Sequence, residues 1–124
     1  MEKEKRNLNE LFSTVKEYFS PKIIDEVNDV YIKIAKVKGG DIPWHIHLNE
    51  DELFYVLKGR LTLELRNGNN IKLNEGELYV VKKGTEHRIQ SEDECRIMLI
   101  ENKTTAHTGN IKTDITRTID EQFY

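Results

Sequence analysis

Hydrophobic residues near the start of the chain recur at helical spacing. Between Leu8 and Phe19, apolar side chains return every three or four residues, with charged residues between them. This spacing places the apolar side chains on one face of a helix. Ser20-Pro21 ends the pattern, because the residue before a proline avoids helical dihedral angles. We therefore predict that residues 1–26 form an N-terminal helical segment with one amphipathic helix of about three turns.

From residue 27 onward the apolar pattern changes to a period of two, which is typical of strands. Turn residues, such as Gly39-Gly40 and Asn67-Gly68, separate the short apolar runs. We interpret these runs as strands at 30–35, 53–57, 61–66, 70–73, 78–81, 87–90 and 96–101. So many short strands favour an all-β sandwich or barrel, which we assign to residues 27–103. The polar residues 104–124 form a C-terminal tail that packs on the barrel or a partner subunit, or pairs as an edge strand.

Composition and charge exclude several classes of protein. The formal net charge is -3 and no basic stripe is present, which argues against nucleic acid and against an anionic membrane surface as partners. No segment approaches the roughly 20 apolar residues that span a bilayer. Residues 1–10 lack the apolar core of a signal peptide, so we expect a cytoplasmic protein. Cys95, the single cysteine, lies in an apolar run, and we interpret it as a buried small hydrophobic residue.

Three histidines and one glutamate form a candidate metal-binding set. His45 and His47 lie two residues apart in an extended segment, and such residues share one face, about 6.6 Å apart. Two imidazoles placed in this way can bind one ion. Glu52 is in phase with the apolar residues that follow it, so its carboxylate would be costly to bury without a cation. His87 lies at the head of another expected strand and could supply a fourth ligand. Taken singly, these residues also fit surface histidines, a solvated acidic loop and a satisfied core histidine.

Two stretches of the chain resemble the sequence motifs of the cupin superfamily. Residues Gly39–Gly59 match the first motif, G-x5-H-x-H-x3-4-E-x6-G, at every defined position. The stretch from Gly76 resembles the second motif, G-x5-P-x-G-x2-H-x3-N, but Lys82 replaces the proline and Ser91 replaces the asparagine. We expect Lys82 to affect the rigidity of the turn and no metal ligand. The resemblance covers residues 31–101.

This resemblance implies a fold and a cofactor. The implied fold is a double-stranded β-helix, or jelly roll. The predicted N-terminal helix lies outside the part of the chain that carries the resemblance. In the family, the residues that match His45, His47, Glu52 and His87 bind one divalent transition metal ion inside the barrel. The donor set suits Mn, Fe, Co, Ni or Zn without choosing among them. The chain is most similar to small single-domain cupins that are often described as mannose-6-phosphate-isomerase-like, a name that reflects fold more than activity.

Three functions are compatible with such a site. The first is a metal-dependent enzyme of the oxygenase, isomerase or lyase type that acts on a small polar, carbonyl-bearing or sugar-like molecule. The second is a non-catalytic module that binds a small molecule such as a sugar. The third is a structural zinc site closed by four protein ligands. No residue is assigned a catalytic role, although Tyr79 and Arg60 are possible pocket residues. His107 is interpreted as a surface histidine, with the alternative that it reaches the mouth of an active site.

The expected strands at 53–57 and 96–100 are apolar on both faces. A strand of a small sandwich needs only one apolar face. The second face must be covered by the helix, by the tail or by another subunit. Cupins of this size are commonly dimers, and we therefore predict a homodimer.

Overall fold

The computed structural model of the chain describes residues 5–124. Within these residues the structure contains two short helices and seven strands. Neither helix has the length and apolar character of a membrane span. In chain order the elements are α1 (Leu8–Thr14), β1 (Lys22–Val27), β2 (Val30–Gly39), β3 (Glu52–Lys58), β4 (Leu61–Leu65), β5 (Asn70–Leu73), β6 (Leu78–Val81), β7 (His87–Asn102) and α2 (Ile119–Gln122).

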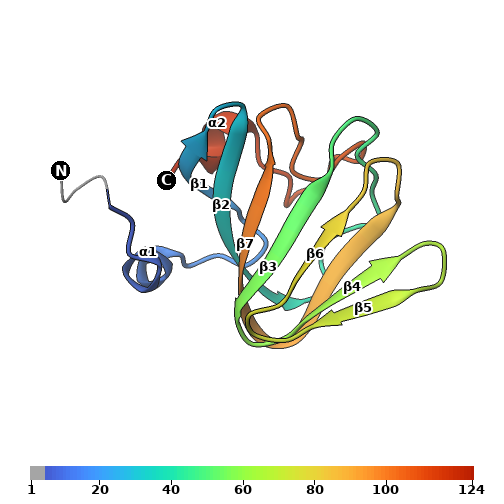
Figure 1. Cartoon of the computed structure of the whole chain (residues 1–124), viewed down its shortest axis with the longest axis horizontal. Coiled ribbons are helices and arrows are strands. Elements are labelled where there is room, and N and C mark those ends of the chain that lie inside the picture. The colour runs from blue at the N-terminus through green and yellow to red at the C-terminus, as the bar shows by residue number, and fades with distance from the viewer. Residues whose placement is uncertain (1–4) are drawn as a thin grey trace.

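The strands form two groups that enclose the core (Figure 1). The larger group has the order β1-β2-β7-β3-β6, and the smaller one consists of β5, β4 and the first part of β7. All these pairings are antiparallel. The architecture confirms the predicted all-β jelly roll with a minor helical component.

Strand β7 differs from the prediction of two separate strands. It runs without interruption from His87 to Asn102, pairing first with β4 and then with β2 and β3. The polar residues 91–94 resemble a turn in the sequence. In the structure they lie at an irregularity of the strand pairing. Val37 pairs with Cys95 and Gly39 pairs with Ser91, so β7 has more residues between these two pairs than β2 has. One strand therefore connects the two sheets.

The N-terminal helix is shorter than predicted, because α1 ends at Thr14 and not at Phe19. The hydroxyl groups of Ser13 and Thr14 donate to carbonyls three residues earlier, which is an alternative to regular helical pairing. Phe19 has a positive φ of 56° and packs in the main core. The prediction also missed β1, which lies inside the segment expected to be helical and pairs with β2.

Two hydrophobic clusters stabilise the fold. The main one lies between the sheets, and Cys95 is fully buried within it, as predicted. Burial raises the pKa of the Cys95 thiol to about 12, which makes it a poor nucleophile. The second cluster lies under α1, where Phe12 and Val15 pack on Ile24 and Ile34.

The helix leaves another apolar part of the large sheet uncovered. Leu53 pairs with Val80 and Ile100, and Tyr55 pairs with Leu78 and Met98, so the side chains of each set point to one face. All six are half-buried or exposed. We call this set the outer strip: Leu53, Tyr55, Leu78, Val80, Met98 and Ile100.

The C-terminal tail packs on the barrel. Its short helix α2 begins with a capping box formed by Thr118 and Glu121. Gln122 is fully buried, and Phe123 forms a bridge to Ile23 of β1. The ring of Phe123 also meets Tyr31 edge-to-face, with 5.8 Å between ring centroids.

Candidate metal centre

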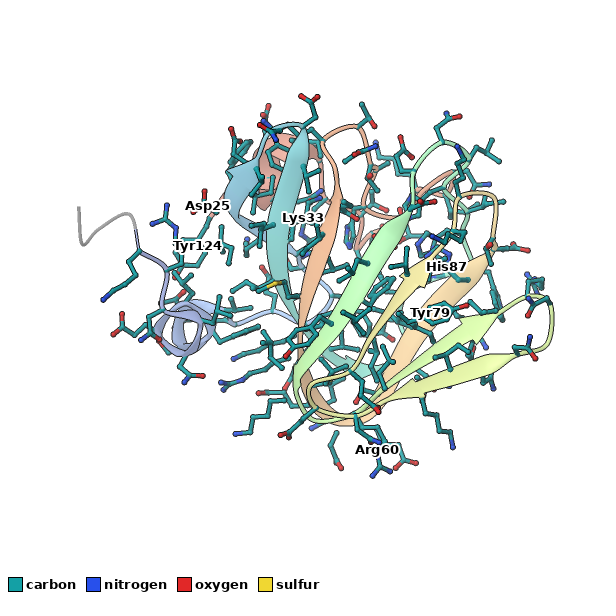
Figure 2. All side chains as sticks on the ribbon, viewed as in Figure 1. Asp25, Lys33, Arg60, Tyr79, His87 and Tyr124 are labelled. Atoms are coloured by element: carbon teal, nitrogen blue, oxygen red, sulfur yellow. The ribbon has the colours of Figure 1, made fainter. Side chains whose placement is uncertain are left out.

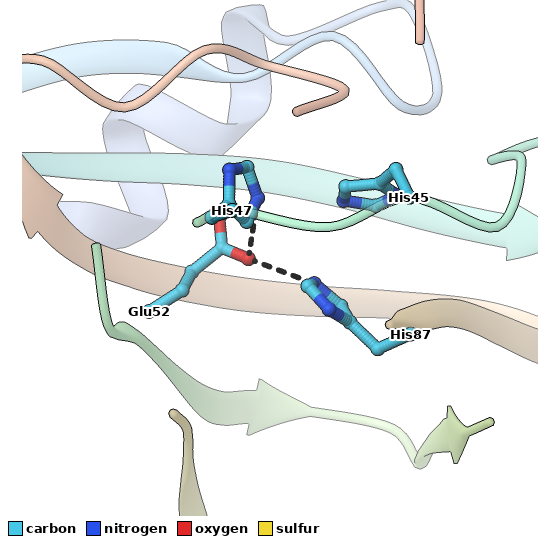
Figure 3. Close-up of side chains that lie close together, drawn as sticks. All are labelled: His45, His47, Glu52 and His87. Atoms are coloured by element: carbon cyan, nitrogen blue, oxygen red, sulfur yellow. Dashed lines mark hydrogen bonds and ion pairs between the residues drawn. The ribbon is translucent and has the colours of Figure 1, made fainter. Parts of the chain in front are cut away.

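The four predicted ligands come from three segments that meet inside the barrel (Figure 3). His45 and His47 lie in the extended loop between β2 and β3, Glu52 is the first residue of β3, and His87 is the first residue of β7. His45 and His87 exchange two backbone hydrogen bonds of 3.0 and 2.9 Å. This bridge fixes the loop against β7. All four side chains are buried.

The spacing of the four side chains fits a single ion. Their possible ligand atoms all lie within 4.8 Å of one another. Ligands on opposite sides of a transition metal ion are about 4.2 Å apart, given bond lengths of about 2.1 Å. Glu52 Oε1 lies 3.5 Å from His47 Nε2 and 3.3 Å from His87 Nε2. The cluster could therefore bind a metal after small side-chain movements.

The backbone orients two of the imidazole rings toward the centre. His45 Nδ1 lies 2.8 Å from the carbonyl oxygen of Pro43, and His87 Nδ1 lies 2.9 Å from that of Thr85. A carbonyl can only accept, so each Nδ1 carries a proton, and each Nε2 is the nitrogen that could bind an ion. Such outer hydrogen bonds commonly orient metal-binding histidines. His47 Nε2 is buried without a hydrogen-bond partner among the described residues, as expected of a nitrogen that awaits an ion.

Burial and neighbouring groups keep two of the candidate ligands, His45 and Glu52, in the protonation states that a metal requires. Burial, together with the neighbouring His87, lowers the pKa of His45 to about 4, so the ring is neutral at pH 7. Burial alone would raise the pKa of Glu52. The neighbouring Glu101, His47 and His87 outweigh that effect, and the pKa of Glu52 lies well below its ordinary value.

A second set of buried polar groups borders the cluster and was not predicted. Glu101 pairs with Glu52 across β7 and β3, and burial together with the Glu52 carboxylate raises its pKa well above the ordinary value. On its other side, Glu101 Oε1 lies 2.6 Å from Lys33 Nζ. Lys33 also donates a hydrogen bond of 2.5 Å to Gln122. This Lys33–Glu101–Gln122 network connects the tail to the cluster.

His107 is not the surface histidine that the sequence suggested. It is half-buried and lines a cavity of about 40 Å³ together with His45 and Glu52. The remaining lining residues are apolar: Phe19, Pro21, Ala35, Val37, Ile42, Phe54, Ile89, Ile97 and Leu99. Sequence spacing gave no signal for His107, because it follows the cluster by twenty residues in a polar tail.

The other two possible pocket residues do not line this cavity. Arg60 is exposed and its Nε donates to Asn74 Oδ1 at 3.1 Å, on a polar groove at the surface. Tyr79 is half-buried and packs against the main core (Figure 2). Lys82 is exposed, and its carbonyl oxygen accepts the N–H of Thr85 at 3.2 Å. The turn before His87 thus closes without the proline of the motif.

Comparisons with known proteins agree with this architecture. The family described as "Cupin domain" (Cupin_2) matches residues 35–101. A solved cupin-2 domain containing protein from Shewanella frigidimarina NCIMB 400 has 41% sequence identity and a TM-score of 0.79, over 83% of this chain and 99% of that protein. Protein NMB1881 from Neisseria meningitidis has 30% identity and a TM-score of 0.73, over 80% and 99% of the two chains.

A curated relative extends the match. The uncharacterized protein YdbB of Bacillus subtilis (strain 168) is 36% identical over 86 residues, which are 69% of this chain and 75% of YdbB. The family match covers more than half of the chain, and the solved relatives share its small, strand-rich fold. The chain therefore belongs to the cupin family.

Proposed function

We propose that this chain is a metal-dependent cupin enzyme, of the isomerase, lyase or oxygenase type, that acts on a small carbonyl- or hydroxyl-bearing molecule. The observation that carries the proposal is the buried convergence of His45, His47, Glu52 and His87 beside a small, mostly apolar cavity. A divalent ion held there would supply Lewis-acid polarisation of a substrate oxygen.

The ligand set supports one transition metal ion per chain, drawn from Mn, Fe, Co, Ni and Zn. Three imidazole nitrogens and one carboxylate form a donor set that these ions accept. The chain's own contribution is to orient the imidazoles through Pro43 and Thr85 and to keep the Glu52 carboxylate ionised. An octahedral ion would retain two positions for small ligands, whereas a tetrahedral zinc would be closed.

The cavity supports a small substrate. A single water needs roughly 10–15 Å³ measured in this way, so about 40 Å³ accommodates only a few non-hydrogen atoms. Its wall is apolar apart from His45, Glu52 and His107. These dimensions favour a compact molecule with one polar end over a hexose.

The first experiment is metal analysis of the purified chain and of Glu52→Gln. We expect about one transition metal ion per wild-type chain and a large loss of metal in the variant. Glu50→Gln is the matched control, because Glu50 lies in the same acidic run but its carboxylate accepts a hydrogen bond from Thr104 outside the cluster. Metal binding that is equal in all three proteins would refute the proposed ligand set.

The second experiment separates an enzyme from the alternatives. The metal-loaded protein is incubated with a panel of small hydroxy-ketones, diols and keto acids, and their consumption is measured with and without oxygen. Turnover that is lost in Glu52→Gln would support the enzyme. Binding without turnover would indicate a binding module, and a closed tetrahedral zinc without exchangeable positions would indicate a structural site.

We also propose that the outer strip is the interface of a homodimer. Its six residues form a contiguous apolar face on the large sheet, next to the part that α1 already covers. Leu78 is 55% exposed within it. Exposed apolar surface of this kind commonly marks an interface between proteins.

A further inference from the structure

The C-terminal tail crosses directly over the loop that carries His45 and His47. Asn110 Oδ1 accepts the backbone N–H of Ile46 at 3.2 Å. Gly109 lies so close to the Ile46 carbonyl oxygen that a Cβ atom at this position would overlap it. The segment around His107 is therefore fixed against the metal-binding loop and does not merely lie near it.

A backbone hydrogen bond fixes which nitrogen of His107 carries a proton. The N–H of Arg117 donates to His107 Nδ1 at 2.9 Å. A nitrogen that accepts a hydrogen bond is unprotonated, so the proton of the ring is on Nε2. Arg117 is itself held by a 2.8 Å hydrogen bond from its guanidinium to the carbonyl oxygen of Ile115. The ring is thus held as the neutral Nε2–H tautomer.

The Nε2–H group is available to a ligand. Within residues 5–124 it has no hydrogen-bond partner, and His107 lines the same cavity as His45 and Glu52. Burial, together with the positive charges of Lys33 and Arg117, lowers the pKa of His107 to about 4, which agrees with a neutral ring. Among the described lining residues, His107 is the polar side chain that remains once His45 and Glu52 are assigned to the metal.

We propose that His107 donates a hydrogen bond from Nε2–H to an oxygen or anionic atom of a small ligand held at the His45–His47–Glu52–His87 centre. The ligand class is a compact carboxylate or carbonyl compound whose apolar part contacts the cavity wall. This inference rests on the proposed function, because it requires a ligand beside the metal. His107 would then favour ligands that place a hydrogen-bond acceptor beside its Nε2, because the rest of the cavity wall outside the metal centre is apolar.

The first test is direct observation of the tautomer. Long-range ¹H–¹⁵N NMR spectra of the metal-free wild-type chain at pH 7 are expected to show His107 protonated on Nε2 alone. A ring protonated on Nδ1, or an imidazolium, would overturn the proposal without bearing on the metal site. This readout does not depend on activity or on a variant that must fold.

The second test uses azide as the probe in the cobalt-loaded chain, followed by the visible spectrum of Co²⁺. His107→Phe keeps a planar ring without the donor, and His107→Gln keeps an N–H near the position of Nε2. We expect about a tenfold weaker azide affinity in His107→Phe and a loss of no more than about threefold in His107→Gln. Lys112→Ala, an exposed change in the same tail, should bind azide as the wild type does.

The outcomes distinguish this inference from the proposed function. If the wild type binds cobalt and azide, and His107→Phe binds both equally well, the role of His107 is refuted while the open metal site stands. If azide causes no change in the wild-type spectrum, the site is closed, and both the proposed function and this inference fail. A purely structural role would alter cobalt affinity or melting temperature similarly in both His107 variants, without a selective effect on azide.

Discussion

Replacing Lys33 with methionine tests whether the buried network beside the metal centre is an energetic unit. Lys33 is 1% exposed, and its ammonium contacts the carboxylate of Glu101 at 2.6 Å and the amide oxygen of Gln122 at 2.5 Å. Removing the ammonium leaves the buried carboxyl group of Glu101 and the amide oxygen of Gln122 without their donor, which costs about 3–5 kcal/mol. For a chain of this length, that loss corresponds to a decrease in melting temperature of about 10–20 °C.

The assay is urea unfolding followed by circular dichroism, on Lys33→Met and on the double variant Lys33→Met/Glu101→Gln. The double variant should recover at least half of the lost free energy of unfolding, because its neutral amide needs no cation. Lys38→Met is the control: it lies on the same strand but is exposed, and should change stability by less than about 0.5 kcal/mol. A single variant as stable as this control, or a double variant no better than Lys33→Met, would refute the reasoning.

The same network makes the effect of Lys33→Met depend on pH. Burial and the Glu52 carboxylate already raise the pKa of Glu101 in the folded state. Lys33 opposes this effect, so its removal raises the pKa of Glu101 in the folded state further above the pKa in the unfolded chain. The variant should therefore regain stability as pH falls toward the unfolded pKa of Glu101, and lose it as pH rises through the folded value. A destabilisation that is constant between pH 5 and pH 8 would contradict this coupling.

Three further predictions concern other parts of the structure. The pKa values of His45 and His107 are each about 4 in the folded state and about 6.5 in the unfolded chain, so the unfolded chain binds more protons between pH 4 and pH 6.5. The free energy of unfolding of the metal-free protein, measured with urea, should therefore decrease by a few kcal/mol as pH falls from 6.5 to 4. Gly109→Ala should lower the melting temperature more than Gly68→Ala, since both glycines have positive φ but only Gly109 meets a neighbouring backbone atom. Leu78→Glu should convert the proposed dimer to monomers in sedimentation analysis.

A specific result would contradict each of these three expectations. Stability that is flat between pH 6.5 and 4 would show that the two rings are not buried as neutral groups. Equal effects of the two glycine variants would mean that the tail does not need its close approach to Ile46. Leu48→Glu, an exposed change outside the outer strip, should leave the mass unchanged. A wild-type chain that is monomeric at micromolar concentration would refute the dimer.

The sequence alone could locate the candidate ligands but not their surroundings. His45, His47, Glu52 and His87 stand at motif spacing, and strand phase explains why two of them share a face. Lys33 and Glu101 are also in phase with inward-facing residues of β2 and β7. A charged residue on a core face becomes informative only when its partner is known, and these two lie far apart in the chain. His107 lacks even this signal, because tertiary contacts of the tail place it.

The limits of the expected elements have similar physical causes. The helix ends early because Ser13 and Thr14 satisfy carbonyls with their side chains, a local choice that hydrophobic spacing does not report. The polar residues 91–94 fall between two expected strands, because an irregular strand and a loop have similar composition. Pairing with β2 and β3 on both sides decides between them.

Strand β7 belongs to both sheets, and this determines when the chain can fold during synthesis. Strands β2, β3 and β4 all pair with β7, yet they precede it by about twenty to sixty residues. Until residues 87–102 have left the ribosome, these three strands lack their common partner, and their backbone groups and apolar faces remain exposed. Residues 87–102 must therefore emerge before either sheet can close, and the candidate ligand His87 arrives with the strand that closes them.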